Sequence, residues 1–336
     1  MTTTSTLPTI ALLLGDPAGI GPELAARLLS RPKTLESANV VVLADAEEYD
    51  QAFKDVGLPL VPVADVPRPG HVVLLDDRSA PVNSIPLQKV STEAGERVMH
   101  QLVRAVELAT AGQIEGIVFM PLNKTSLHLA GMDEKDELRW FAKRLGYEGT
   151  TSELNVLDHL WTARVTSHIA MSDVAARITK EAVTATIQLL HDVLRDSGLE
   201  QPRLGVCALN PHGGENGTFG REEIDQIRPG VEAARGSGID ATGPFPSDTI
   251  FIAARSGKFD GVVTMYHDQG QIAMKLMGFD KGVSIQGGLP IAIATPAHGT
   301  AFDIVGKRVA NLGSSENAFD IAVSIASRRL ASNALR

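Results

Sequence analysis

The sequence predicts an α/β fold with a largely parallel sheet, and three observations lead to this class. Short β-branched apolar runs alternate with longer segments whose apolar residues recur at helical spacing. Polar residues follow several of these runs directly, as they do at the carboxyl ends of parallel strands. The balance of 43% hydrophobic and 21% charged residues is that of an ordinary globular protein.

The expected strands and helices follow one another along the whole chain. Each expected strand is a short run rich in apolar and β-branched residues, and each expected helix ends at a glycine. The expected strands are 9–14, 39–45, 70–76, 116–122, 155–161, 163–168, 203–209 and 259–267. The clearest expected helices are 93–112 and 179–198.

The chain of 336 residues is long enough for two domains, but no repeat or low-complexity linker divides it. The most linker-like stretch, DVPRPGH at 65–71, is too short to separate domains. We therefore expect a second domain to be built by the chain crossing over and returning.

Composition excludes several classes of partner. The net charge of −9 and the lack of Lys/Arg-rich runs argue against a general nucleic-acid binder. The single cysteine, Cys207, allows no intrachain disulfide and suits a reducing compartment. The first residues lack the basic region of a signal peptide, and no stretch reaches the roughly 18 apolar residues of a membrane span. We expect a cytoplasmic protein with a small-molecule ligand.

The segment GDPAGIGPEL, residues 15–24, lies between the first expected strand and a helix. Its glycines suit either a phosphate-binding turn or an ordinary strand-to-helix turn. They fall at 15, 19 and 21, which does not match GxGxxG, and no GK[ST] of a P-loop follows. Proline near a helix start fits a tight turn. The spacing favours turn geometry, and it gives Asp16 and Glu23 no catalytic assignment.

Three histidines follow expected strands at their carboxyl ends, where α/β proteins form a ligand crevice. They are His168, His212 and His267. Imidazoles at three such places can hold one metal ion, and an all-histidine site suits Zn, Co or Ni better than Mg. Their wide sequence spacing is a weaker signal than a compact metal motif, and each histidine alone also fits a turn or a core hydrogen bond.

The stretch AHGTAFDIVG, residues 297–306, is a second glycine-bearing loop. Its backbone N–H groups and His298 would serve the adenine or phosphate of a dinucleotide, and the alternative is a plain loop leading into a helix. No acidic residue lies at the sequence spacing at which a Rossmann fold binds the ribose 2′-hydroxyl of NAD, so the sequence does not distinguish NAD from NADP.

Eight stretches together resemble the 4-hydroxythreonine-4-phosphate dehydrogenase (PdxA) family of vitamin B6 biosynthesis. They occur in the family's order and cover almost the whole chain, and NPHGGENG and MYHDQG are specific signatures. The stretches are GDPAGIGPEL, MPLNKTSLHLAG, TSHIAMSDV, LNPHGGENGTFGREEID, GPFPSDTIF, MYHDQGQIAMKLMGF, GVSIQGGLP and HGTAFDIVG.

The resemblance implies the two-domain architecture of the isocitrate and isopropylmalate dehydrogenases, with the active site in the interdomain cleft. It also implies a homodimer whose active sites are shared between subunits. We place the first domain, with much of the NAD(P) site, at residues 1–130 plus 290–336. The second domain, with the metal ligands and dimer contacts, would cover 131–289.

The resemblance also assigns roles to particular residues. The metal ligands would be His168, His212 and His267, with one supplied by the partner subunit. Asp248 and Lys275 match the family's substrate-contacting Asp and Lys, and Asp268 would orient a ligand. The cofactor residues would be His298, Gly299, Thr300, Ala301 and Asp303.

The implied reaction is oxidation of a hydroxy acid by NAD(P)+ with the help of one divalent metal ion. A metal that holds the substrate hydroxyl lowers its pKa and favours hydride transfer to the nicotinamide. A ketone formed β to a carboxylate can then lose CO2. Lys275 would relay a proton or hold a carboxylate, and Zn is the expected ion, with Co, Mn or Mg as alternatives.

One part of the sequence departs from the family. In an ungapped alignment, Glu137 and Leu138 stand where the family has the His and Thr that hold the substrate phosphate. Ser284 lies where the family has an asparagine, and Ile293 lies where it usually has an arginine. A carboxylate repels a phosphate dianion, and leucine donates no hydrogen bond. The expected substrate residues are Glu137, Leu138, Arg139, Lys275, Ser284 and Ile293.

These changes favour a family member that acts on a different, non-phosphorylated hydroxy acid. One alternative is a dehydrogenase of the terephthalate cis-dihydrodiol type. Another is a genuine 4-hydroxythreonine-4-phosphate dehydrogenase in which Arg139, Lys143 or Arg144 takes over the phosphate. More remote alternatives are a three-histidine metal hydrolase and a binding protein without turnover. The HGTAFD stretch favours a dehydrogenase, because a hydrolase needs no dinucleotide.

Overall fold

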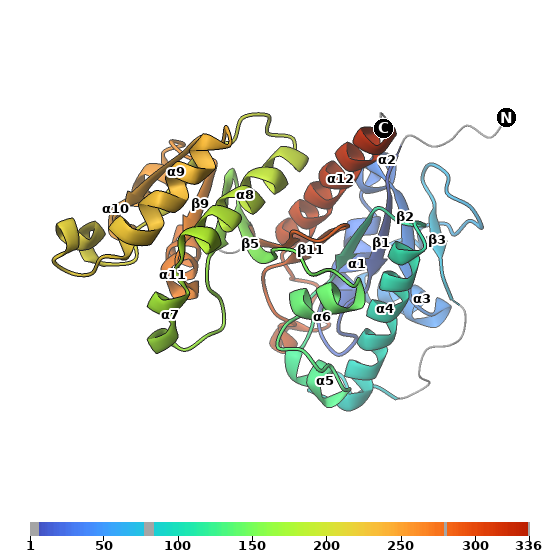
Figure 1. Cartoon of the computed structure of the whole chain (residues 1–336). Helices are drawn as coiled ribbons and strands as arrows, with labels where there is room; N and C mark the ends of the chain where they lie inside the picture. The colour runs from blue at the N-terminus through green and yellow to red at the C-terminus, as the bar shows by residue number, and fades with distance from the viewer. Residues whose placement is uncertain (1–6, 77–83, 279–280, 335–336) are drawn as a thin grey trace. The chain divides into compact units, whose positions relative to one another are not determined.

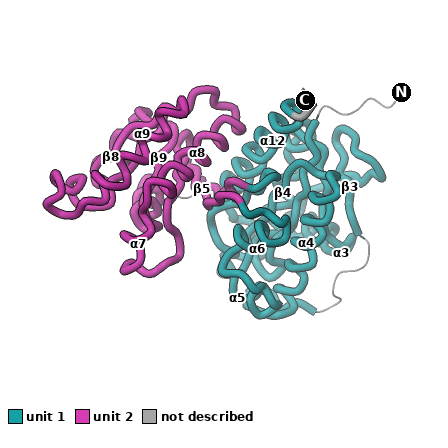
Figure 2. Tube along the Cα trace, viewed as in Figure 1, with its two compact units in different colours: residues 1–148, 289–336 teal, residues 149–288 magenta. Residues whose placement is uncertain are grey.

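Two units make up the chain, and the structure, a computed structural model, describes residues 7–76, 84–278 and 281–334. Unit 1 consists of residues 1–148 and 289–336, and unit 2 consists of residues 149–288 (Figure 2). Each unit carries its own strands and helices (Figure 1). The predicted α/β class is confirmed.

Unit 1 is built on parallel strands in the order β3-β2-β1-β4-β11. The strands are β1 (Thr9–Leu13), β2 (Asn39–Leu43), β3 (Val72–Leu74), β4 (Gly116–Phe119) and β11 (Ala292–Pro296). The helices are α1 (Gly21–Leu29), α2 (Pro32–Ser37), α3 (Ala46–Val56), α4 (Thr92–Thr110), α5 (Lys124–Leu129), α6 (Glu137–Arg144) and α12 (Gly313–Ala334). Alternate residues of the strands, such as Ala11, Leu13 and Ile117, join a core cluster with α4 and α6.

Unit 2 contains strands in the order β10-β5-β6-β9-β7-β8. These are β5 (Ser152–Leu157), β6 (Leu160–Arg164), β7 (Leu204–Cys207), β8 (Ala241–Phe245), β9 (Gly261–Thr264) and β10 (Val283–Gly287). The α-helices are α7 (Met171–Arg177), α8 (Lys180–Asp196), α9 (Arg228–Gly236), α10 (Ser247–Arg255) and α11 (His267–Gly278). Two further turns are η1 (Pro211–Gly217) and η2 (Glu223–Ile227). Strand β5 runs antiparallel to both β10 and β6, whereas β6, β9, β7 and β8 are parallel.

The antiparallel strands correct one prediction. The apolar run 155–161, expected as one strand, is the end of β5, a two-residue turn and the start of β6. Asp158 adopts the left-handed conformation, with φ of 52°, which lets the chain reverse within this run. The run 163–168 likewise contains only the end of β6, and β8, β10 and β11 were not among the expected strands.

The chain passes from unit 1 to unit 2 after residue 148 and returns at residue 289. The sequence placed these crossings after 130 and at 290, and that division into domains stays a prediction. Segment 131–148 stays with unit 1 because α6 contributes Trp140 and Phe141, both fully buried, to that unit's core. The Phe141 ring lies 6.0 Å from that of Phe119 on β4.

Candidate functional site: a histidine pair and a nucleotide loop

Two of the three predicted metal-binding histidines lie together in unit 2. Strands β6 and β9 are parallel neighbours, so the segments that leave their carboxyl ends emerge at the same edge. His168 lies beyond β6, and His267 is the first residue of α11, directly after β9. Their ring centroids are 5.5 Å apart. The wide sequence separation of these residues therefore conceals a short spatial distance.

The two histidines line a cavity of about 200 Å³ in unit 2. The other lining residues are polar Thr166, Ser167, Tyr266 and Asp268 and apolar Ile169, Met171 and Val174. A cavity lined by imidazole groups and by both polar and apolar residues suits a small, mixed-polarity ligand.

Asp268 fixes the ring of His267. The Nδ1 atom of His267 lies 2.7 Å from Oδ1 of Asp268. A carboxylate partner keeps the proton on Nδ1 and leaves the lone pair on Nε2 for a metal ion. The orienting role of Asp268 stays a prediction.

His212 lies apart from this pair, on the loop that contains η1. Its side chain is 69% exposed, and the run 212–216 adopts positive φ throughout, from 42° at Glu215 to 77° at Gly214. Three of these five residues are not glycines, and each costs about 1 kcal/mol in this conformation. Among the described residues, no group of three His, Cys, Asp or Glu side chains converges to hold a metal.

The buried carboxylate of Glu223 holds the His212 loop, a contact that sequence reasoning missed. Its Oε1 accepts hydrogen bonds from the backbone N–H groups of Leu209 and Asn210, at 2.8 and 2.7 Å. Its Oε2 accepts one from Asn210 Nδ2 at 3.0 Å. Glu223 is only 1% exposed. The sequence GREEID offers two adjacent glutamates, and nothing in it distinguishes the buried one.

The predicted catalytic residues Asp248 and Lys275 lie on the two helices of unit 2 that follow β8 and β9. Asp248 is in the first turn of α10, and Lys275 is in the last turn of α11. Both side chains are exposed.

Ser284 lies in a buried polar network beneath α11. Its hydroxyl donates to Glu153 Oε1 at 3.1 Å and accepts from Asn155 Nδ2 at 3.3 Å. Arg164 binds the same two side chains, with Nη2 2.7 Å from Glu153 Oε2. Gln271 of α11 donates to Asn155 Oδ1 at 2.6 Å. The network joins α11 to β5, β6 and β10 and occupies the Ser284 hydroxyl.

The predicted nucleotide loop follows β11 in unit 1. Its predicted cofactor residues are His298, Gly299, Thr300, Ala301 and Asp303, and they lie next to one another. Thr300 is 7% exposed and its carbonyl accepts a hydrogen bond from Ile20 N–H at 3.0 Å. Ala301 adopts a positive φ of 43°, and Asp303 is exposed.

The predicted substrate residues of α6 have different surroundings. Leu138 is 9% exposed and belongs to the unit 1 core, as does Ile293 on β11, which is 1% exposed. The Glu137 carboxylate lies 3.5 Å from Lys124 Nζ. Arg139 is exposed. Only Glu137 and Arg139 of this set therefore present a charged group near the protein surface.

The other two cationic side chains of α6, Lys143 and Arg144, already contact other residues of the chain. Lys143 Nζ lies 2.5 Å from Asp133 Oδ2 and 3.1 Å from Glu134 Oε1. The guanidinium group of Arg144 lies 5.3 Å from the centre of the Trp140 ring. Arg139 is therefore the best placed of the three cations to receive an anion.

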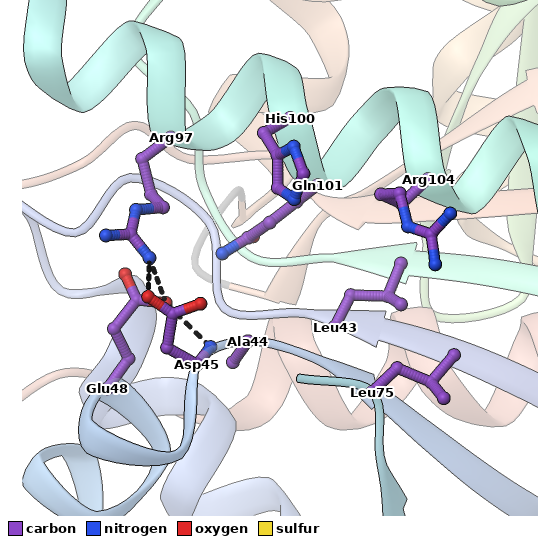
Figure 3. A pocket seen from close by; sticks show the side chains of 9 residues that line it. All are labelled: Leu43, Ala44, Asp45, Glu48, Leu75, Arg97, His100, Gln101 and Arg104. Atoms are coloured by element: carbon purple, nitrogen blue, oxygen red, sulfur yellow. Dashed lines mark hydrogen bonds and ion pairs between the residues drawn. The ribbon is translucent and has the colours of Figure 1, made fainter. Parts of the chain in front are cut away.

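A small polar cavity in unit 1 contains none of the predicted site residues (Figure 3). Arg97 of α4 bonds to Asp45 and lies 3.2 Å from Glu48 of α3. Burial raises the pKa of Glu48, and the charge of Arg97 opposes this effect. The cavity volume is about 20 Å³, room for one water molecule. We assign this cluster to the attachment of the N-terminal end of α3 to Arg97 of α4.

Comparisons with known proteins agree with one another. The sequence matches the family described as "Pyridoxal phosphate biosynthetic protein PdxA" over residues 36–322. A Pseudomonas aeruginosa protein named "Putative 4-hydroxythreonine-4-phosphate dehydrogenase 2" is 51% identical over 328 residues, which cover 94% of this chain and 96% of that protein. A Cupriavidus necator protein named D-threonate 4-phosphate dehydrogenase is 37% identical, with 96% and 98% covered.

Solved structures show the same relationship. A 4-hydroxythreonine-4-phosphate dehydrogenase from Burkholderia phymatum matches with a TM-score of 0.79 at 35% identity, covering 95% of this chain and 98% of that one. A β-decarboxylating dehydrogenase from Thermococcus kodakarensis matches with a TM-score of 0.52 at 15% identity, covering 97% and 89%, and shares the fold. No helix in the described parts of the chain has both the length and the apolar character to cross a membrane.

Proposed function

The chain belongs to the PdxA family and is an oxidoreductase acting on a hydroxyl group, and from this premise we propose that it oxidises a small hydroxy acid with NAD(P)+ and one divalent metal ion. The observation that carries the proposal is the His168–His267 pair beside a cavity of small-ligand size. Both imidazoles leave the same edge of the sheet, where α/β enzymes bind their ligands.

The residues present fit a metal ion. His168 and His267 supply imidazole nitrogens, and Asp268 holds His267 in the orientation that leaves Nε2 available. Imidazole ligands suit Zn and Co, with Mn or Mg as weaker candidates. His212 would complete the set across a homodimer, each site taking one histidine from the partner subunit. Its high exposure supports a role at a surface that another chain covers.

The loop 298–303 in unit 1 is the proposed nucleotide site. A metal ion held by the histidines would polarise the substrate hydroxyl, and a nicotinamide at this loop would supply the hydride acceptor. Lys275 would bind a substrate carboxylate or take up the hydroxyl proton at its Nζ atom, and Asp248 would bind a second polar group of the substrate. A ketone formed β to a carboxylate would then lose CO2.

Four positions support a substrate that lacks the usual phosphate. Leu138 and Ile293 offer no hydrogen bond, and the Ser284 hydroxyl is already paired with Glu153 and Asn155. The Glu137 carboxylate would repel a phosphate dianion. We therefore propose a non-phosphorylated hydroxy acid as the substrate, with a cis-dihydrodiol of an aromatic acid among the compounds to be tested.

A phosphorylated four-carbon acid is the second candidate. The names of the relatives, which include a D-threonate 4-phosphate dehydrogenase, favour it. Within the chain, the exposed side chain of Arg139 favours it, because a guanidinium group binds phosphate well. On this alternative, Arg139 replaces the missing histidine and threonine contacts.

A substrate panel separates the two candidates. Phosphorylated and non-phosphorylated hydroxy acids, including 4-phosphohydroxythreonine, 4-phospho-D-threonate and aromatic dihydrodiols, would be assayed by NAD(P)H absorbance with Zn2+, Co2+ or Mn2+. The first proposal expects turnover of a non-phosphorylated acid and little effect of Arg139→Ala. Efficient turnover of a phosphorylated acid, lost in R139A, would reject it in favour of the second.

The metal assignment has its own test. His267→Ala should abolish metal-dependent turnover, and His159→Ala, at the β5–β6 turn of the same unit, should not. Thermal shifts with NAD+, NADP+ and metal ions would identify the ligands, because a ligand that binds the folded state raises its stability. A normal turnover rate in H267A would refute the assignment.

A further inference from the structure

The segment GDPAGIGPEL has no part in the chemistry proposed above, yet it contacts the proposed nucleotide loop, 298–303, at Thr300, and α1 contacts the end of the segment that follows this loop, at Ala310. At the near end, Ile20 N–H donates to the carbonyl of Thr300 at 3.0 Å. At the far end, Glu23 Oε1 accepts from Ala310 N–H at 3.2 Å. Residues at the start of α1 therefore bind the 300–310 segment at both of its ends, Thr300 and Ala310.

The contact at Ala310 involves two side chains of α1, those of Glu23 and Arg27. Arg27 Nη1 lies 3.1 Å from Glu23 Oε1, and the same nitrogen donates to the Ala310 carbonyl at 2.5 Å. Both backbone groups of Ala310 are thus bound by one ion pair, one helical turn apart on α1. Glu23 is 8% exposed, so water competes little for its oxygens.

The near contact depends on the glycine at position 19. A Cβ added to Gly19 would lie 2.8 Å from both the Cβ and the carbonyl oxygen of Thr300. Glycine is therefore needed for the close approach of the two segments, and the approach permits the Ile20–Thr300 hydrogen bond.

Other ion pairs join α2 and its N-cap residue to the C-terminal helix α12. Arg31 pairs with Glu316 at 2.9 Å, and Lys33 pairs with Asp320 at 2.6 Å. Neither pair contacts Ala310, which is bound by Glu23 and Arg27 of α1.

We propose that Glu23, together with Arg27, is a positioning residue that sets the conformation of loop 298–310 before the nucleotide binds. The inference rests on the proposed function, since it takes residues 298–303 of this segment as the NAD(P) site. An ordered loop loses less conformational entropy on binding, so its anchors contribute to nucleotide affinity without touching the nucleotide.

The test compares Glu23→Ala, Glu23→Gln and Arg27→Met with Lys33→Met, which removes an exposed ion pair on the neighbouring helix. Nucleotide affinity and metal affinity would be titrated separately on the purified protein. Hydrogen exchange of residues 298–310 would be followed without nucleotide. E23A should weaken NAD(P)+ binding about tenfold, the loss of one charge-assisted contact, and speed exchange in the loop.

The other variants sharpen the result. E23Q keeps an acceptor for Ala310 N–H and loses the charge, so it should fall between wild type and E23A. K33M should behave as wild type, and metal affinity should stay unchanged in all four. Unchanged loop exchange in E23A, or an equal loss of metal and nucleotide affinity, would overturn the inference. If the wild type binds neither NAD+ nor NADP+, the proposed function fails, and loop exchange still decides whether Glu23 orders the loop.

Discussion

The two loops to which we assign ligand contacts are held in different ways. The nucleotide loop of unit 1 has several separate anchors: Ile20 at Thr300, Gln88 at Val305, and the Glu23–Arg27 pair at Ala310. The His212 loop of unit 2 is held at its start by buried Glu223, which accepts from three donors and alone binds the two backbone N–H groups, while Glu222 Oε2 accepts from Asn210 Nδ2 at 2.6 Å.

The difference has an energetic consequence. Distributed anchors share the cost of ordering a loop, so the loss of one leaves the others in place. In the His212 loop, Glu223 alone accepts from two backbone N–H groups, and its removal leaves both of them unpaired. We therefore expect single substitutions to have larger effects in the His212 loop than in the nucleotide loop.

Removal of Glu223 should give the largest effect. Glu223→Ala leaves the N–H groups of Leu209 and Asn210 without their acceptor, which should lower the free energy of unfolding by about 3 kcal/mol. It should also weaken metal binding, because the strained run that carries His212 loses its support. Urea unfolding and metal titration measure both. Glu223→Gln, which keeps one acceptor oxygen, is the control, and a fully stable E223A would contradict the single-anchor description.

Two adjacent glycines test the same anchor with less damage. Gly213 and Gly214 both have positive φ, at 69° and 77°, so alanine costs about 1 kcal/mol at either. A Cβ at 214 would also lie 2.6 Å from Glu223 Oε2, whereas a Cβ at 213 would meet nothing within 4 Å. Gly214→Ala should therefore lose about 2 kcal/mol and Gly213→Ala only about 1 kcal/mol in urea unfolding. Equal losses would show that contact with Glu223 does not matter.

The nucleotide loop should respond more mildly. Gly19→Ala places a methyl group against Thr300 and should displace the near anchor while the Ala310 contacts remain. We expect a loss of about 1 kcal/mol in stability and a rise in KM for NAD(P)+ with little change in kcat. Gly236→Ala, whose Cβ would meet nothing within 4 Å, is the control. A loss in G19A as large as that in E223A would show that the nucleotide loop also depends on one contact.

The smallest effect should be a pH dependence at Asp16. Burial raises the pKa of this carboxyl, and a hydrogen bond from Ala18 N–H partly opposes the rise. A carboxyl whose folded pKa exceeds its unfolded pKa binds more protons in the folded state, so it lowers stability as pH rises between the two values. Asp16→Asn should therefore be more stable than wild type near neutral pH, by a margin that shrinks toward about pH 4.

Urea unfolding at several pH values measures that margin. Asp65→Asn, at an exposed loop position, serves as the control and should track wild type. A margin that stays constant with pH would show that the pKa of Asp16 does not differ between the folded and unfolded protein, which would contradict the prediction.

Local patterns predicted a good part of the fold and the site. The alternation of apolar runs and helical segments predicted the α/β class. The sequence expected His168, His212 and His267 to share one metal site; the structure brings the rings of His168 and His267 to 5.5 Å and leaves His212 apart, and the metal site stays a prediction. The hairpin at Asp158 was missed because the strands on both sides of the turn are apolar, which hides the reversal within one run.

The sequence by itself determined the fold class, the family and the residues that follow each strand, because periodicity and motif spacing are local properties. The tertiary structure alone decided which carboxylates act as anchors. Glu23 and Ala310 are 287 residues apart, and Glu223 lies 14 residues from Leu209 across a loop. It also decided that Leu138 and Ile293 belong to a core and that the Ser284 hydroxyl is occupied. The physical reason is that burial and hydrogen-bond pairing depend on segments brought together by packing, which no local pattern records.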